Sequence, residues 1–95
     1  MMTDQQLSIE QDVRSFVVSN FLFGVDNGLT TEQSFLSSGI IDSTGVLELV
    51  AFLEQNYKLR IADDELLPEN LDSLQRVAGF VSRKLAGATG SESTR

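Results

Sequence analysis

The chain has 95 residues, which is enough for one domain but too few for two independent hydrophobic cores. Hydrophobic residues make up 41% and charged residues 22%, as in folded domains, and a net charge of -7 disfavours nucleic acid and anionic membrane surfaces as partners. The absence of Cys and His excludes disulfides, thiolate nucleophiles, zinc–thiolate sites and every Ser-His or Cys-His catalytic arrangement.

The N-terminal segment predicts a helix without a targeting signal. Residues 1–6 have neither a basic nor an apolar region, and no apolar run in the chain approaches the length of a bilayer span. We therefore expect a cytoplasmic protein with no signal peptide. Over residues 4–23 the apolar side chains recur at helical spacing, which places on one face Ile9, Val13, Phe16, Val17 and Phe21.

Residues 25–41 predict a long connection that is pinned to the core. The segment has no sustained period and is long against the usual connection of about 4–6 residues. Its apolar residues argue against a loose linker: Leu29, Phe35, Leu36, Ile40 and Ile41. We expect one helical turn within it, at residues 31–34.

A second helix is predicted to begin at Asp42-Ser43, because either side chain can accept a hydrogen bond from the first free backbone N–H groups. Its inward face has helical spacing and consists of Val46, Leu49, Val50, Leu53 and Tyr57. Glu48 and Glu54 are expected to point away from the core. Lys58 and Arg60 lie beyond the end of this helix, where positive charge suits the helix dipole.

The rest of the chain predicts a short helical turn within residues 61–70 and a last helix. Asp72 and Gln75 have the spacing of a capping box, so the last helix is expected to begin near Asp72. Its inward face consists of Leu74, Val77, Ala78, Val81 and Leu85. Residues 87–95 are small and polar and predict a disordered tail, which leaves residues 1–86 as the domain.

These elements predict an all-α fold, a small four-helix bundle with three longer helices, one short helix and a long first crossover loop. No strand-like alternation competes with the helical pattern. The phenylalanines sit mostly at core spacing and are expected to line the bundle, where they could shape a crevice: Phe16, Phe21, Phe23, Phe35, Phe52 and Phe80.

The most informative local feature is Ser43, which stands where the long loop becomes a helix. A phosphate attached to its hydroxyl would be stabilised by the helix dipole and by unsatisfied N–H groups. The simpler interpretation is that Ser43, or Asp42 beside it, only caps the helix.

The stretch from Asp42 to Leu53, with Gly39 before it and residues 68–81 after it, resembles the acyl carrier protein family. The resemblance extends over roughly residues 7–86 and rests on the Asp-Ser pair, the pinned loop, the run VLELVAFLE and the helix order. It implies that Ser43 receives a covalent 4′-phosphopantetheine arm from coenzyme A, with Asp42 and Thr44 beside the attachment point. It also implies a carrier that is not an enzyme and that takes its thiol from the arm.

Two departures point to a specialised carrier. Carriers of general fatty-acid synthesis usually have Leu or Met after the serine and often an acidic residue next, whereas this chain has Thr44 and Gly45. The pattern is closer to stand-alone carriers that load amino acids, such as D-alanyl carrier proteins. The cargo implied is an acyl or aminoacyl group, in a fatty-acid, polyketide or nonribosomal pathway.

Acidic residues predict docking to basic surfaces of partner enzymes. From 42 to 57 the second helix holds acidic residues and no Lys or Arg, and charge complementarity speeds encounter. The docking candidates are Leu47, Glu48 and Glu54. The partners implied are a phosphopantetheinyl transferase, a loading enzyme and downstream acyl-processing enzymes, with the carrier itself a monomer.

Other interpretations remain. An acidic helical protein-interaction module without a prosthetic group explains the charge and the helices equally well, but leaves the placement of Ser43 unexplained. A calcium site at residues 63–65 lacks the alternating oxygen ligands of an EF-hand, and a hydrolase using Ser43 would lack a His base. We therefore expect no metal site and no catalytic residue.

Overall fold

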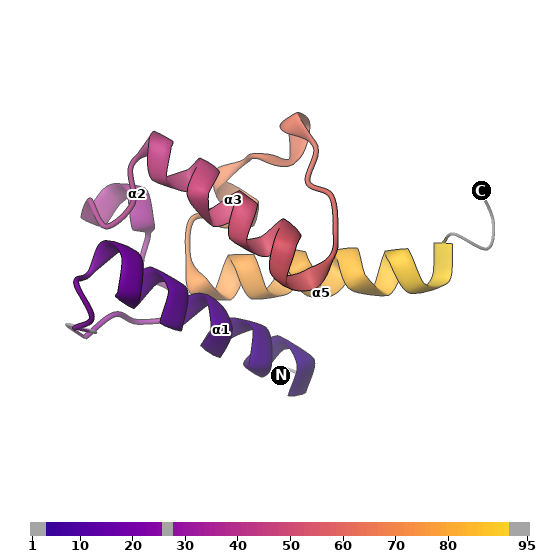
Figure 1. The fold of residues 1–95 in the computed structure, drawn as a ribbon, viewed down its shortest axis with the longest axis horizontal. Helices are drawn as coiled ribbons and strands as arrows, with labels where there is room; N and C mark the ends of the chain where they lie inside the picture. The colour runs from indigo at the N-terminus through magenta and orange to yellow at the C-terminus, as the bar shows by residue number, and fades with distance from the viewer. Residues whose placement is uncertain (1–3, 26–27, 92–95) are drawn as a thin grey trace.

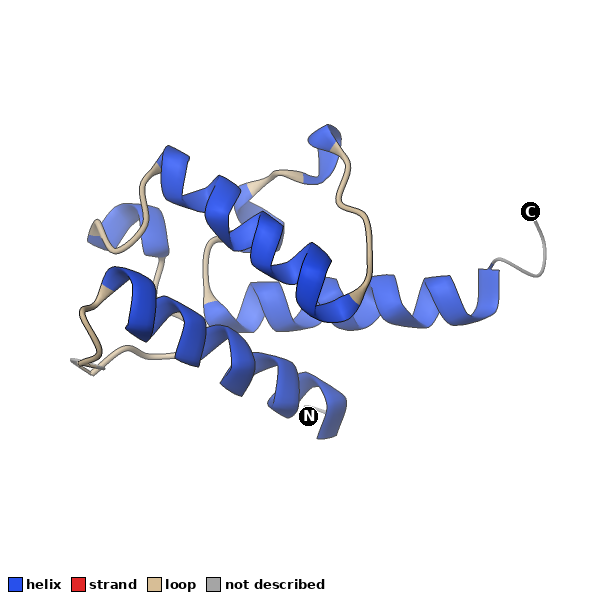
Figure 2. Cartoon of the chain, in the orientation of Figure 1, coloured by secondary structure: helices blue, strands red, loops and turns tan. Residues whose placement is uncertain are grey.

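The computed structural model describes residues 4–25 and 28–91, the side chains of 88–91 excepted. The described chain is all-helical, without strands (Figures 1 and 2), and confirms the predicted small helical bundle. Three long helices, two single-turn helices and one 3₁₀ turn follow in the order α1 (Asp4–Phe21), α2 (Phe35–Ser38), α3 (Ser43–Tyr57), η1 (Asp63–Glu65), α4 (Pro68–Leu71) and α5 (Leu74–Ser91).

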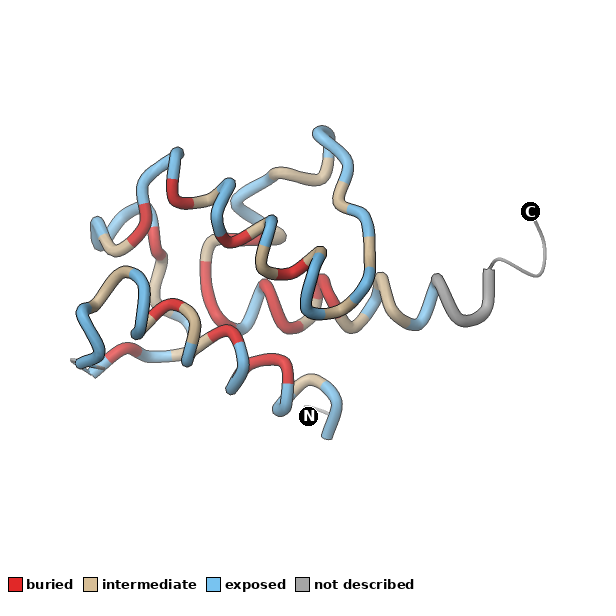
Figure 3. Tube along the Cα trace, viewed as in Figure 1, coloured by how far each residue is buried: buried red, intermediate tan, exposed pale blue. Residues whose placement is uncertain are grey.

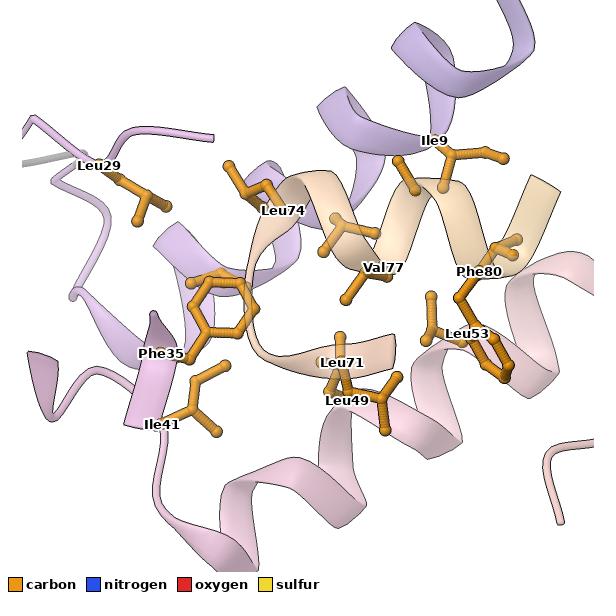
Figure 4. Packing of buried hydrophobic residues seen from close by; sticks show 14 residues of the cluster. Ile9, Leu29, Phe35, Ile41, Leu49, Leu53, Leu71, Leu74, Val77 and Phe80 are labelled. Carbon is orange, nitrogen blue, oxygen red and sulfur yellow. The ribbon is translucent and has the colours of Figure 1, made fainter. Parts of the chain in front are cut away.

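The core lies between the three long helices, with α1 and α5 in the most extensive contact. Buried positions follow the inner faces of these helices (Figure 3), and Leu29, Phe35 and Ile41 of the connecting segment join them (Figure 4). The connection between α1 and α3 is therefore pinned, as predicted. On α3, Leu49 and Leu53 are fully buried, and Val46 and Val50 pack against the core from half-buried positions.

The end of α1 is a sharp turn. The carbonyl of Val18 accepts from both Leu22 N–H at 3.2 Å and Gly24 N–H at 2.8 Å, so the helix stops at Phe21. Phe23 and Gly24 then both have positive φ, of 57° and 84°. Phe23 points into solvent, and the prediction that it lines the bundle is wrong.

The prediction of a helical turn at residues 31–34 is also wrong. The helical turn of this segment is α2, four residues later. Ser34 is extended, with φ -71° and ψ 126°, and its hydroxyl accepts from Ser37 N–H at 3.0 Å. A residue in this conformation is the N-cap of the helix that follows rather than part of a helix.

The last helix does not begin with the predicted capping box. The hydroxyl of Ser73 accepts from Arg76 N–H at 3.1 Å, so Ser73 caps α5, and Gln75 N–H donates to the carbonyl of Thr31 at 2.9 Å. Asp72 instead ends α4. At its other end α5 continues to Ser91, past the predicted domain boundary at 86, while the rest of the predicted tail, residues 92–95, is outside the described residues.

No helix in the described part of the chain is both long and apolar enough to span a bilayer.

Candidate functional site

The start of α3 is capped by Asp42. Asp42 is extended, with φ -95° and ψ -176°, and its Oδ1 accepts from Gly45 N–H at 2.7 Å. Its carbonyl accepts from Val46 N–H at 3.0 Å, which closes the first helical turn. Of the two capping candidates at this position, the carboxylate therefore holds the helix, and Ser43 is its first residue.

The side chain of Ser43 is exposed. Within the described chain its hydroxyl has no hydrogen-bond partner, since the capping bond belongs to Asp42. The N–H groups of the first turn of a helix lack intrahelical acceptors, and the positive end of the helix dipole lies there. A negatively charged group on the Ser43 hydroxyl would be stabilised by both. Thr44 is exposed beside it.

Gly45 is buried, although it follows an exposed serine and threonine. A Cβ at this position would lie 2.8 Å from Cε1 of Phe21 and 2.9 Å from Cγ2 of Ile41, closer than side chains pack. Gly45 therefore lets the end of α1 pack directly against the start of α3.

The loop before α3 is held in place by Asp72, at the junction of α4 and α5. The carboxylate of Asp72 accepts from Leu36 N–H at 3.0 Å and from the Ser34 hydroxyl, and its carbonyl accepts from Phe35 N–H at 2.7 Å. Phe35 in turn accepts from Ile41 N–H at 3.2 Å through its carbonyl. This chain of bonds fixes the path of the loop up to the residue before Asp42.

A largely apolar pocket of about 260 Å³ opens beside Ser43, between α2, the first turns of α3 and residues 66–72. Three exposed leucines belong to its lining, one from each wall: Leu36, Leu47 and Leu67. Phe35 is the only phenylalanine among the residues that line it. Phe16 and Phe52 stack on each other elsewhere, with ring centroids 4.4 Å apart.

The three predicted docking residues lie in different surroundings. Leu47, one turn after Ser43, and Glu48 beside it are exposed on the first half of α3. Glu54 lies on the last turns of α3 and is half-buried, and its Oε2 accepts from Ile61 N–H at 2.9 Å. Glu54 therefore holds the loop after α3 in place.

The acidic segment after α3 also contains a structural carboxylate. Glu65 accepts from Ala62 N–H at 2.8 Å and forms an ion pair with Lys84 of α5 at 2.9 Å, and these contacts lower its pKa. Among the described residues no cluster of three or more carboxylates is arranged to hold a metal ion.

The chain is similar to two curated proteins over most of its length, although no protein-family model matches it. It is 29% identical over 75 residues to a protein of a Serratia species named "Probable acyl carrier protein PigG", covering 79% of this chain and 86% of that protein. It is 31% identical over 77 residues to a protein of Akkermansia muciniphila named "Acyl carrier protein", covering 80% of this chain and 91% of that protein.

Proposed function

Because the chain belongs to the acyl carrier protein family, whose members are carriers rather than enzymes, we propose that it holds its cargo as a thioester on a 4′-phosphopantetheine arm attached to Ser43. The cargo is an acyl or aminoacyl group, and the pathway is a specialised one. Thr44 and Gly45, which depart from the pattern of general fatty-acid carriers, support the specialised role.

The observation that carries this proposal is the division of roles between Asp42 and Ser43. The first turn of α3 needs one side-chain acceptor, and the Asp42 carboxylate provides it. The hydroxyl of Ser43 is then exposed, unbonded within the described chain, and next to free N–H groups of a 15-residue helix. These are the features that the phosphodiester of an arm needs.

The arm, when attached, supplies the thiol that forms the thioester, in a chain that has no Cys. The residues of this chain then orient and shelter what is attached. Asp42 and Thr44 flank the attachment point, and the apolar pocket beside Ser43 offers a surface for apolar parts of the cargo.

The partners we propose are a phosphopantetheinyl transferase, a loading enzyme and downstream acyl-processing enzymes, acting on a monomeric carrier in the cytoplasm. Asp42 and Glu48 give the exposed surface around Ser43 a negative charge, which suits basic surfaces on these enzymes. Leu47 adds an exposed apolar contact one turn from Ser43. We retain Glu54 as a weaker docking candidate, since its carboxylate already binds Ile61 N–H.

Arm attachment tests the proposal. The purified chain is incubated with coenzyme A and a phosphopantetheinyl transferase, and its intact mass is measured before peptide mapping. We expect the mass of one phosphopantetheine group on the peptide that contains Ser43, and none in Ser43→Ala. Ser37→Ala, which removes another exposed serine at the same end of the bundle, should be modified normally.

An adduct on another residue, or none with transferases of several types, would contradict the proposal. The second outcome would favour the alternative, an acidic helical interaction module without a prosthetic group.

A further inference from the structure

Phe23 is the most exposed large hydrophobic residue of the described chain, with 95% of its surface accessible. It stands in the turn after α1, where Val25 N–H donates to the Leu22 carbonyl at 3.0 Å. The two central residues of that turn, Phe23 and Gly24, have φ of 57° and 84°. The ring therefore projects from a tight turn into solvent.

The turn would be more stable with another residue in place of Phe23. Turns with two left-handed central residues favour Asn, Asp or Gly at the first of them, because a bulky side chain is strained there. A buried aromatic could offset this strain by packing, but the ring of Phe23 is almost fully exposed. The folded chain thus gains nothing from this ring. Strained backbone conformations cluster at functional positions such as ligand clamps.

The turn lies at the same end of the molecule as Ser43. The ring of Phe21, two residues before Phe23, meets the backbone at Gly45, two residues after Ser43. Figure 1 shows the end of α1 beside α2 and the start of α3, at the end of the bundle away from the C-terminal part of α5. A protein that covers Ser43 over the area of an ordinary interface would therefore reach this turn.

We propose that Phe23 is a docking side chain that enters an apolar pocket of the enzyme that attaches the arm to Ser43. This inference rests on the proposed function. The transferase must cover the start of α3 to reach the Ser43 hydroxyl, and Asp42 and Glu48 are exposed on that helix. The exposed ring of Phe23 follows the end of α1, which packs against the start of α3 through Phe21 and Gly45. The complementary surface is an apolar pocket flanked by cationic groups. Aromatic anchors in such pockets dominate many interfaces.

The test compares arm attachment with stability in three variants. Phe23→Asn removes the ring and keeps a residue that suits the turn, Phe23→Trp keeps an aromatic ring, and Leu7→Gln removes an exposed apolar side chain on the first half of α1. We expect Phe23→Asn to melt at the same or a higher temperature than the wild type. Its kcat/KM for attachment, measured with coenzyme A and the transferase, should fall roughly tenfold, mainly through KM. Phe23→Trp and Leu7→Gln should stay near the wild-type rate.

Three results would overturn the inference. If the wild type takes the arm on Ser43 and Phe23→Asn takes it at the same rate, the docking role fails and the proposed function stands. If the wild type forms a dimer by light scattering and Phe23→Asn separates it, the ring serves a second copy of this chain. If the wild type takes no arm, the proposed function fails together with the inference.

Discussion

The two ends of α3 each carry a hydroxyl, and the structure uses the two hydroxyls differently. At the first residue the Ser43 hydroxyl is exposed and has no partner within the described chain, whereas at the last residue the Tyr57 hydroxyl donates to Asp12 of α1 at 2.8 Å. Burial, and then the bond to Asp12, raise the pKa of Tyr57. The hydroxyl of Tyr57 holds the end of α3 against α1. The start of α3 is capped by the Asp42 carboxylate, which leaves the Ser43 hydroxyl available.

The acidic residues of α3 follow the same division. Glu48 near the start is exposed, and Glu54 near the end holds the backbone of Ile61. Only about 9 Å of helix, the rise over six residues, separates the exposed Glu48 from Glu54, which is used for folding. A negative charge on α3 does not by itself indicate docking, because its position decides which of the two roles it has.

The largest loss of stability is expected from a change at Asp72, which holds the loop in front of Ser43. Asp72→Ala removes a charged acceptor of two hydrogen bonds and should lower the free energy of unfolding by about 1.5–3 kcal/mol. Hydrogen exchange should rise at the amides of residues 35–41 and much less at the end of α3. Asp64→Ala, which removes an exposed acidic side chain, is the control, and equal losses in both variants would show that Asp72 has no special role.

The next effect concerns the packing beneath the exposed Ser43. Gly→Ala within a helix normally stabilises by about 1 kcal/mol. Gly45→Ala should instead destabilise by about 1–3 kcal/mol, because the new methyl group meets Phe21 and the buried Ile41. Gly79→Ala in α5, where the nearest atom would be 3.5 Å away, should show the normal gain. Urea unfolding of both variants measures the difference, and a gain in both would contradict the close packing.

A smaller effect should separate the two glutamates of α3. Glu48→Lys should slow arm attachment severalfold at low salt and less at high salt, because exposed charge pairs are worth about 0–1 kcal/mol and are screened. Glu54→Lys should mainly lower the melting temperature, because it removes the acceptor of Ile61 N–H. Attachment rates across a salt series and thermal melts test both variants. An unchanged rate for Glu48→Lys would remove the support for its docking role.

The smallest effect should be the pH dependence of the stability that Glu65, in the loop after α3, contributes to the fold. Ala62 N–H and Lys84 hold the pKa of Glu65 below its ordinary value of 4.5, so its charged form stabilises the fold. That contribution is present above pH 4.5 and is lost as the pH falls through the lowered pKa. Glu65→Gln should therefore lower the melting temperature at pH 7, with the gap from the wild type narrowing below pH 4.5. A gap that is constant with pH would contradict the role of this charge.

The sequence predicted the helices well where local periodicity is decisive. The spacing of Leu49 and Leu53 gave the correct inner face of α3, and the Asp42-Ser43 pair gave its start. The sequence could not decide which of the two caps the helix, because either side chain can reach the free N–H groups. The roles became distinct only in the geometry of the first turn.

The predictions that failed depend on contacts between distant residues. Asp72 and Gln75 match a capping box, but the carboxylate of Asp72 accepts a hydrogen bond from Ser34, 38 positions away. The neighbouring Ser73 caps α5 instead. The need for Gly45 comes from Phe21 of another helix. Phe23 fits a core pattern, yet α1 ends just before it and the turn directs it outward. Local sequence patterns cannot predict these contacts, because the contacting residues are far apart in the sequence.

The division of roles between Asp42 and Ser43 is tested most directly by the unfolding free energies of Asp42→Ala and Ser43→Ala, measured in urea on the chain without an arm. Loss of a capping side chain costs about 0.5–2 kcal/mol. We expect this loss for Asp42→Ala and a change within about 0.5 kcal/mol for Ser43→Ala, as for an exposed side chain without a structural contact. A larger loss in Ser43→Ala than in Asp42→Ala would mean that Ser43, and not Asp42, caps α3.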